Sequence, residues 1–169
     1  MSMRRGYKRK KGKKIVKTKK VLKYNDSGVE FVFKSGLELY CYKQLKASGL
    51  DFKYEPTSFE LVPKEKLHFD IYKKGRKQKD GSKPFKKMVT KTSQPISYKP
   101  DFVIYYNDEI VYVIETKGYA NESFAIRVKL WYSYCCKELN NMKAYFLPSN
   151  QKEVDSTIST ILEDVKGYK

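Results

Sequence analysis

The sequence is poor in the residues that build zinc sites and disulfide networks. It has one histidine, His68, and three cysteines among 169 residues. The cysteine count is odd and Cys135 and Cys136 are adjacent, so the spacing fits neither a metal site nor a set of paired disulfides. Such thiols are typical of a reducing compartment, and we expect a cytoplasmic protein.

Long apolar runs are missing as well. No stretch approaches the roughly 20 apolar residues that span a bilayer, and the basic N-terminus lacks the apolar segment of a secretory signal. We therefore expect no membrane partner. What the chain does have is 40% hydrophobic residues, including an aromatic content of 15%. Together with the length, this composition predicts one folded domain with its own core.

Positive charge is abundant and unevenly distributed. The formal net charge is +17, from 36 Lys/Arg and 19 Asp/Glu. Residues 1–23 contain 12 of these basic residues and no acid, and residues 64–91 contain 11 with three acids. The remaining 13 basic and 16 acidic residues make the rest slightly acidic. This division indicates cationic segments that bind a polyanion around a core that holds a cation, although charge alone equally suits a ribosomal-type RNA-binding protein.

The same division predicts the domain organisation. Residues 1–23 are Lys/Gly-rich and are expected to form a disordered basic tail. Residues 24–169 then form the folded domain, with a basic insertion at about 64–95. Glycines and a proline punctuate that insertion, which indicates a long hairpin or flap.

Hydrophobic periodicity predicts an α/β fold with a central mixed sheet flanked by helices. Helices are expected over residues 36–47 and 122–139, followed by a last helix that Ser149 or Asn150 caps and that runs to Val165. The expected strands are 67–72, 98–106, 110–117 and 142–147. Residues 29–33 would form a short strand or an extended entry, and 52–62, which contains Pro56, would form an edge or bent strand. The strand over 110–117 is apolar without alternation, which is typical of a central strand covered on both faces.

Two of these strands carry acids that a hairpin would bring together. A three-residue turn at Asn107–Glu109 would pair Tyr106 with Ile110. It would also place Asp101 directly across from Glu115, with Cβ atoms about 4.5–5.5 Å apart. A turn one residue different would move Asp101 to the other face of the sheet.

This geometry predicts a metal site. Because side chains alternate along a strand, Glu115 and Lys117 point to one side and Thr116 to the other. Two neighbouring carboxylates repel unless a cation lies between them, and Mg²⁺ commonly takes one or two carboxylates. We expect Asp101 and Glu115 to bind Mg²⁺, for which Mn²⁺ can substitute. The Thr116 carbonyl and Glu38 are further expected ligands, and Lys117 would orient or deprotonate a water or neutralise phosphate charge.

The motifs resemble those of the PD-(D/E)XK nuclease superfamily, which has a restriction-endonuclease-like fold. Pro100-Asp101 and Glu115-Thr116-Lys117 match its two defining halves, and Glu38 matches the acid that many members carry on their first helix. The fragments Ser-Gly-Leu-Glu, Pro-Asp-Phe and Glu-Thr-Lys-Gly look like those of the phage endonuclease I family of Holliday-junction resolvases. The stretch Gly118–Lys129 is similar to a phage-encoded family of resolvase-like proteins of unsettled function.

The resemblance covers about Val29–Pro148 and implies an αβββαβ core. The catalytic set that it implies is Glu38, Asp101, Glu115 and Lys117. It also implies phosphate contacts from Arg127 and Lys129, although these are two apart on a helix and at least one should be solvated. The other expected nucleic-acid contacts are Lys99 beside the acids and Lys73, Lys74, Arg76 and Lys77 in the flap.

Relatives of endonuclease I are intertwined homodimers, so the resemblance implies a homodimer in which Glu38 acts in trans. The basic insertion is longer than the corresponding bridge of that family, which is a departure from its pattern. The resemblance implies a Mg²⁺-dependent endodeoxyribonuclease, encoded by a phage and active in the host cytoplasm. Its expected substrate is DNA, branched or duplex.

Each acid also has a structural interpretation. Glu38 completes a capping box at the start of its helix. Asp101 follows a proline and suits a turn, and Glu115 suits a salt bridge to Lys117 or Lys99. The competing function is a non-catalytic nucleic-acid-binding protein, either a degenerate nuclease fold or an RNA-assembly factor. A pure binder has no use for acids that face phosphate, so the intact acids favour the enzyme.

Overall fold

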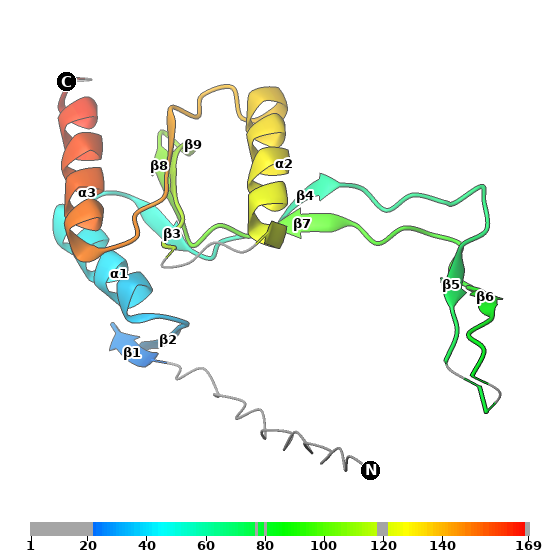
Figure 1. Cartoon of the computed structure of the whole chain (residues 1–169). Coiled ribbons are helices and arrows are strands. Elements are labelled where there is room, and N and C mark those ends of the chain that lie inside the picture. Colours follow the sequence, from blue (N-terminus) through cyan, green and yellow to red (C-terminus); the bar gives the residue numbers. More distant parts are fainter. Residues whose placement is uncertain (1–21, 77, 80, 118–121, 168–169) are drawn as a thin grey trace, which may run out of the picture.

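The computed structural model describes residues 22–117, except 77 and 80, and residues 122–167. These residues form a mixed α/β fold (Figure 1). The helices are α1 (Gly36–Ser48), α2 (Glu122–Glu138) and α3 (Gln151–Lys166). The strands are β1 (Leu22–Asp26), β2 (Val29–Phe33), β3 (Phe52–Tyr54), β4 (Phe59–Val62), β5 (Tyr72–Lys74), β6 (Phe85–Lys87), β7 (Ile96–Tyr98), β8 (Phe102–Tyr106), β9 (Glu109–Ile114) and β10 (Ala144–Phe146).

A four-stranded sheet forms the centre of the described chain, in the order β10-β9-β8-β3. Strand β8 is antiparallel to β3 and β9, and β10 is parallel to β9. The predicted mixed sheet with flanking helices is therefore confirmed. In Figure 1, α1 and α3 lie on one side of this sheet and α2 on the other.

Alternating residues of β8 and β9 build a core on each face of the sheet. On one face Phe102, Ile104 and Ile114 pack with buried residues of α1 and α3. On the other face Val103 and Val113 pack around Trp131 of α2, as members of a second cluster. The predicted covering of the apolar strand on both faces is confirmed, and Glu115 directly follows the end of this covered strand.

The turn between β8 and β9 differs from the predicted one. It has two residues, Asn107 and Asp108, both with positive φ, as the tight right-twisting hairpin turn requires. An irregularity after Ile104 then shifts the pairing by one residue, so that Phe102 still pairs with Ile114. The prediction of a three-residue turn is wrong. The predicted register is kept at Phe102 and Ile114, next to the acids, because the irregularity supplies the residue that the turn lacks.

The helix boundaries follow their predicted caps. Ser35 accepts a hydrogen bond from the backbone N–H of Glu38, and Gly49 ends α1 with a φ of +72°. Of the two predicted caps for the last helix, Asn150 is the N-cap of α3. No helix among the described residues is long and apolar enough to cross a membrane.

The basic insertion forms a two-stranded arm, which we define as residues 59–98. Strands β4 and β7 pair at its base, Lys66 and Thr92 form a bridge farther out, and β5 and β6 pair toward its tip. Figure 1 shows this arm extending away from the central sheet. Near the tip, the Gly75 N–H donates to the Pro84 carbonyl at 2.8 Å, and a Cβ at Gly75 would lie 2.8 Å from that oxygen.

Three predicted strands differ from the observed ones because part of each belongs to the arm. The predicted strand 52–62 is split into β3 and β4, because the chain turns at Glu55, whose φ is +42°. The predicted strand 98–106 is likewise split, since β7 leaves the sheet to join the arm. The predicted strand 67–72 is wrong, and β5 begins only at Tyr72.

At the N-terminus, β1 begins at Leu22, so the last two residues of the predicted tail belong to a strand. Residues 1–21 of that tail lie outside the described residues.

Candidate active site

A pocket of about 620 Å³ opens where the sheet, α1 and α2 meet. The residues that line it come from the start of α1, the β3–β4 connection, the end of β7 and the β7–β8 connection, the residues after β9 and the start of α2. They are Lys34, Ser35, Glu38, Ser58, Ser97, Tyr98, Lys99, Asp101, Glu115, Thr116, Lys117, Phe124 and Arg127. All four predicted catalytic residues are therefore brought to one place.

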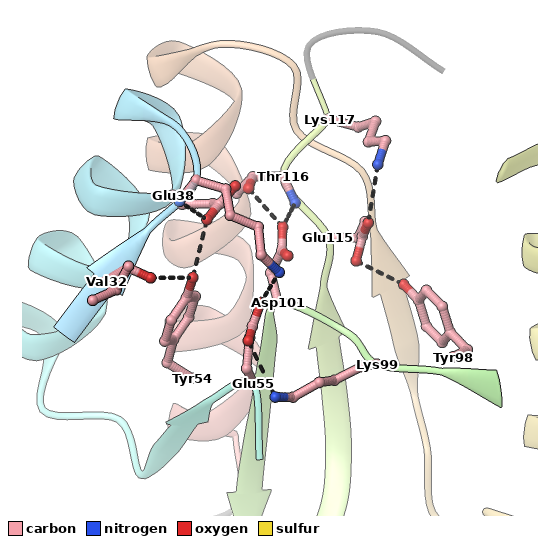
Figure 2. Close-up of polar contacts among 11 residues, drawn as sticks. Val32, Glu38, Tyr54, Glu55, Tyr98, Lys99, Asp101, Glu115, Thr116 and Lys117 are labelled. Atoms are coloured by element: carbon pink, nitrogen blue, oxygen red, sulfur yellow. Dashed lines mark hydrogen bonds and ion pairs between the residues drawn. The ribbon is translucent and has the colours of Figure 1, made fainter. Parts of the chain in front are cut away.

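Asp101 is buried at the point where the chain enters β8. Its Oδ2 accepts two hydrogen bonds from Thr116, one from the backbone N–H at 2.9 Å and one from the hydroxyl at 2.7 Å. The sequence predicted that the Thr116 side chain points to the side opposite Glu115 and Lys117, and the structure places it against Asp101. There the Thr116 side chain fixes one edge of the Asp101 carboxylate (Figure 2).

Glu115 is held from two sides. The Tyr98 hydroxyl donates to its Oε2 at 2.9 Å, and the Lys117 ammonium lies 3.5 Å from its Oε1. Figure 2 shows the Glu115 carboxylate between these two groups. The predicted shared side of Glu115 and Lys117 is confirmed, and the contact is also the ion pair that the structural interpretation of Glu115 expected.

Both acids are costly to ionise where they lie. Their side chains lie in residues that are only 8% and 6% exposed. Burial, and then the negative charge of Glu115, raise the pKa of Asp101 to about 7. Burial likewise raises the pKa of Glu115, and its contacts with Tyr98 and Lys117 only partly offset that effect. A divalent cation between these carboxylates would remove the repulsion.

The donor set fits a hard cation that keeps most of its waters. Among the described residues, no group of three or more His, Cys, Asp or Glu residues is arranged to hold a metal ion. The pocket offers instead the carboxylate pair Asp101 and Glu115, both oxygen donors. Mg²⁺ typically takes one or two carboxylates and completes its shell with water and phosphate oxygens, so the pair suits Mg²⁺ better than zinc.

Glu38 serves as a structural group in addition to lining the pocket. It is buried, and its Oε2 accepts from the Lys34 backbone N–H at 2.9 Å and from the Tyr54 hydroxyl at 3.0 Å. These bonds resemble the reach-back of a capping box, shifted by one residue from Ser35 to Lys34. The capping interpretation of Glu38 is confirmed in part: Ser35 accepts from the Glu38 N–H, but the Glu38 carboxylate accepts from the Lys34 amide and not from that of the cap residue. A role at the metal remains a prediction.

Lys117 is positioned by more than its ion pair. Its ammonium lies 4.4 Å from the centroid of the Phe124 ring, a cation–π contact with the first turns of α2. Its side chain keeps 35% exposure. The lysine can thus reach a substrate in the pocket while two contacts limit its movement.

Three residues at the rim form a cluster that sequence reasoning missed in part. The Glu55 carboxylate makes ion pairs with Lys34 and with Lys99, the latter at 3.1 Å. Burial raises the pKa of Glu55, but hydrogen bonds from Lys34 and Lys99 more than offset this effect, so the pKa lies below its usual value. Lys99 was predicted as a phosphate contact. Lys34 precedes the Ser35 cap, and that position was the signal that could have placed it at the pocket.

Behind Glu115 lies a hydrogen-bonded tyrosine pair. The Tyr98 and Tyr145 hydroxyls are 2.7 Å apart, and the Tyr98 ring packs on Trp131 with centroids 5.0 Å apart. Tyr98 and Trp131 are both buried in the second core cluster. The contact of the Tyr98 hydroxyl with Glu115 was missed, because it depends on the chain leaving the sheet at β7.

The predicted nucleic-acid contacts are divided between the pocket and the arm. Arg127 lines the pocket, whereas Lys129 is exposed on α2 and is not among the described lining residues, so the expected solvation of one of them fits Lys129. Lys73, Lys74 and Arg76 are exposed on the arm, and Lys77 lies outside the described residues. The expected charge is thus present near the acids and on the arm.

No curated protein and no solved structure matches the chain. The model of one protein family matches residues 14–147, which includes the pocket acids and the whole arm. The chain therefore belongs to the family described as "Protein of unknown function (DUF1064)".

Proposed function

We propose that this protein is a Mg²⁺-dependent endodeoxyribonuclease that hydrolyses phosphodiester bonds in branched or duplex DNA. The observation that carries the proposal is the buried pair Asp101 and Glu115, with Lys117 beside it in an open, basic-rimmed pocket. Two buried acids at one point are costly to ionise unless a cation accompanies them. A pocket built on that pair is suited to a metal-assisted reaction on a polyanion.

In this proposal Asp101 and Glu115 hold Mg²⁺, with the Thr116 carbonyl and Glu38 as further ligands. The metal would supply Lewis acidity at the scissile phosphate and an acidified water. Thr116 fixes the Asp101 carboxylate through two hydrogen bonds, and Tyr98 fixes that of Glu115. Each carboxylate therefore presents one oriented edge before substrate arrives.

Lys117 would act on the substrate itself. Its ammonium sits 3.5 Å from Glu115 and so lies next to the place where the phosphate must bind. There it would orient the attacking water or neutralise the charge that develops on the phosphate. Lys34, Lys99 and Arg127 surround the same pocket and would hold the flanking phosphates.

The arrangement of elements supports a restriction-endonuclease-like core. Along the chain, α1 is followed by three antiparallel strands of the central sheet (β3, β8, β9), then by α2, then by the parallel strand β10. This is the αβββαβ order that the sequence resemblance implies. A phage origin, a preference for Holliday junctions and a homodimer with Glu38 acting in trans belong to the same proposal.

A cleavage panel tests the function. The full chain is incubated with linear duplex, single-stranded, flap and four-way DNA, each in Mg²⁺, in Mn²⁺ and in EDTA. We expect nicks or double-strand cuts with either metal and none in EDTA. Binding without cleavage of any of these substrates would favour the alternative of a non-catalytic nucleic-acid-binding protein.

A further inference from the structure

The outer part of the arm has one face that alternates rings and cations. In the β5–β6 pair, Tyr72 lies opposite Lys87 and Lys74 lies opposite Phe85. Residues two apart on a strand share a face, so these four side chains lie together, with each ring beside a lysine. We call this set of Tyr72, Lys74, Phe85 and Lys87 the aromatic face. The opposite face carries Lys73 and Lys86.

Both rings of the aromatic face are largely uncovered. Tyr72 is 56% exposed and Phe85 is 71% exposed, although rings of this size normally contribute most of their area to a core. A hollow of about 610 Å³ adjoins the face through Lys87, and two other exposed apolar residues, Phe69 and Val89, line it. The Lys87 ammonium pairs with Asp70 at 2.6 Å at this border. Four large apolar side chains exposed on one part of the arm indicate a binding surface.

The charge of the arm decides what kind of occupant fits. Residues 64–91 contain 11 Lys/Arg and three acids, so a second copy of the arm or any basic protein surface would be repelled. A polyanion is attracted. Within nucleic acids, paired bases present only their edges, whereas unpaired bases expose the flat faces on which aromatic rings stack. Rings set among lysines therefore match unpaired nucleotides.

We propose that the aromatic face of the arm binds unpaired nucleotides, with Tyr72 and Phe85 stacking on bases and Lys74 and Lys87 contacting the adjoining phosphates. The inference rests on the proposed function, since it names unpaired nucleotides next to the cleaved duplex as the feature that selects the substrate. A substrate with such nucleotides would occupy the pocket and the arm together, whereas fully paired DNA would lack the stacking contacts.

Equilibrium binding without catalysis tests this proposal. Fluorescence anisotropy with the full chain in EDTA measures the affinity for labelled oligo(dT), oligo(U) and a blunt duplex. For the double variant Tyr72→Ala/Phe85→Ala we expect affinity for the two single strands to fall by about tenfold or more, because stacking on each ring is lost. Affinity for the blunt duplex should stay within about twofold, and the salt dependence should not change because no charge is removed.

Two matched variants control for the change of surface. Lys73→Ala/Lys86→Ala alters the opposite face of the same strands, and it should reduce the salt slope without changing the preference for single strands. Val29→Ala removes another apolar side chain that is 55% exposed, on β2, and should leave all affinities unchanged. Circular dichroism verifies that each variant is folded.

The proposal is overturned if Tyr72→Ala/Phe85→Ala binds oligo(dT) and oligo(U) as the wild type does, or if it loses single-strand and duplex affinity equally. The first result would assign the rings to another partner, such as an acidic protein, and the second would assign them to folding of the arm. Failure of this inference is separable from failure of the nuclease proposal, because the binding assay contains no metal and needs no cleavage. A difference between oligo(dT) and oligo(U) would identify the nucleic acid that the face prefers.

Discussion

The pocket and the arm differ in exposure and in charge: the pocket contains buried acids, whereas the arm carries exposed rings and lysines. The pocket buries two acids beneath a packed sheet, so that Asp101 and Glu115 are less than a tenth exposed, and it fixes each with hydrogen bonds. The arm exposes its rings and lysines, and it is joined to the rest mainly at its base, where Phe59 packs on Trp131. Chemistry needs fixed groups, whereas capture of a polyanion needs reach and charge. Changes in the pocket should therefore alter rate, and changes in the arm should alter affinity.

The largest expected effect comes from Lys117→Ala, which separates rate from affinity most sharply. We expect single-turnover cleavage to fall by about 10²- to 10⁴-fold, since a group that assists proton transfer or charge neutralisation is lost. DNA affinity measured in EDTA should change less than about threefold. Lys129→Ala is the matched control, because it removes the same charge from an exposed site on α2. Equal rates for Lys117→Ala and wild type would contradict the claim that changes in the pocket alter the rate of cleavage.

Tyr98→Phe should have the next largest effect, by acting on Glu115 rather than on substrate. Removing the hydroxyl that donates to Glu115 should weaken Mn²⁺ affinity by about tenfold or more, as changes to groups that orient metal ligands typically do. Titration of Mn²⁺ followed by electron paramagnetic resonance measures this directly. Tyr145→Phe, one step farther from Glu115, should give a smaller loss. Identical Mn²⁺ affinities for wild type and both variants would contradict a positioning role for Tyr98.

Glu38→Gln distinguishes the two roles of the acid on α1. Gln keeps an oxygen that can accept from the Lys34 N–H and the Tyr54 hydroxyl, so the free energy of unfolding should change by less than about 1 kcal/mol. The negative charge is lost, and we expect cleavage to slow by about tenfold. Urea denaturation and single-turnover rates measure the two effects. A variant with unchanged rate would leave Glu38 with its capping role alone.

The smallest effect is thermodynamic and concerns the pocket without substrate. An acid whose pKa is raised on folding binds more protons in the folded state, so stability falls as pH rises from about 4 towards the raised value near 7 of Asp101. Mg²⁺ bound to these carboxylates would compete with the protons. A Mg²⁺ concentration of 100 times the Kd at pH 8 should raise the Tm by roughly 5–10 °C at pH 8, and the same concentration should raise it far less at pH 5.

Asp101→Asn should reduce the pH dependence in this window, leaving the part that comes from Glu115, and should remove most of the Mg²⁺ effect. Differential scanning fluorimetry across pH, with and without Mg²⁺, measures them. A shift of Tm by Mg²⁺ that is the same in wild type and in Asp101→Asn would place the cation elsewhere.

The sequence predicts the pocket better than the arm, for physical reasons. Strands β8 and β9 are largely apolar and pair antiparallel, and this pattern predicted that Asp101 and Glu115 lie near each other. The turn itself was predicted wrongly, because a two-residue turn with a bulge replaces the expected three-residue turn. Local turn chemistry is a weaker constraint than burial of a whole strand.

What could not be predicted depends on where the chain leaves the sheet. Glu55 adopts a positive φ at the end of β3, and Tyr98 ends a strand of the arm instead of beginning β8. Their contacts with Lys99 and Glu115 join segments more than 15 residues apart and leave no periodic signal. The aromatic face was likewise hidden, because its pattern appears only once Tyr72 is known to pair with Lys87.

The most direct test of the account compares wild type with Asp101→Asn on the DNA that the wild type cleaves best. Single-turnover cleavage in Mg²⁺ and binding in EDTA are measured on the same preparations. The account predicts that Asp101→Asn binds this DNA as tightly as the wild type and does not cut it in Mg²⁺ or Mn²⁺. Cleavage by Asp101→Asn at the wild-type rate would contradict the claim that the buried acid pair is the catalytic centre.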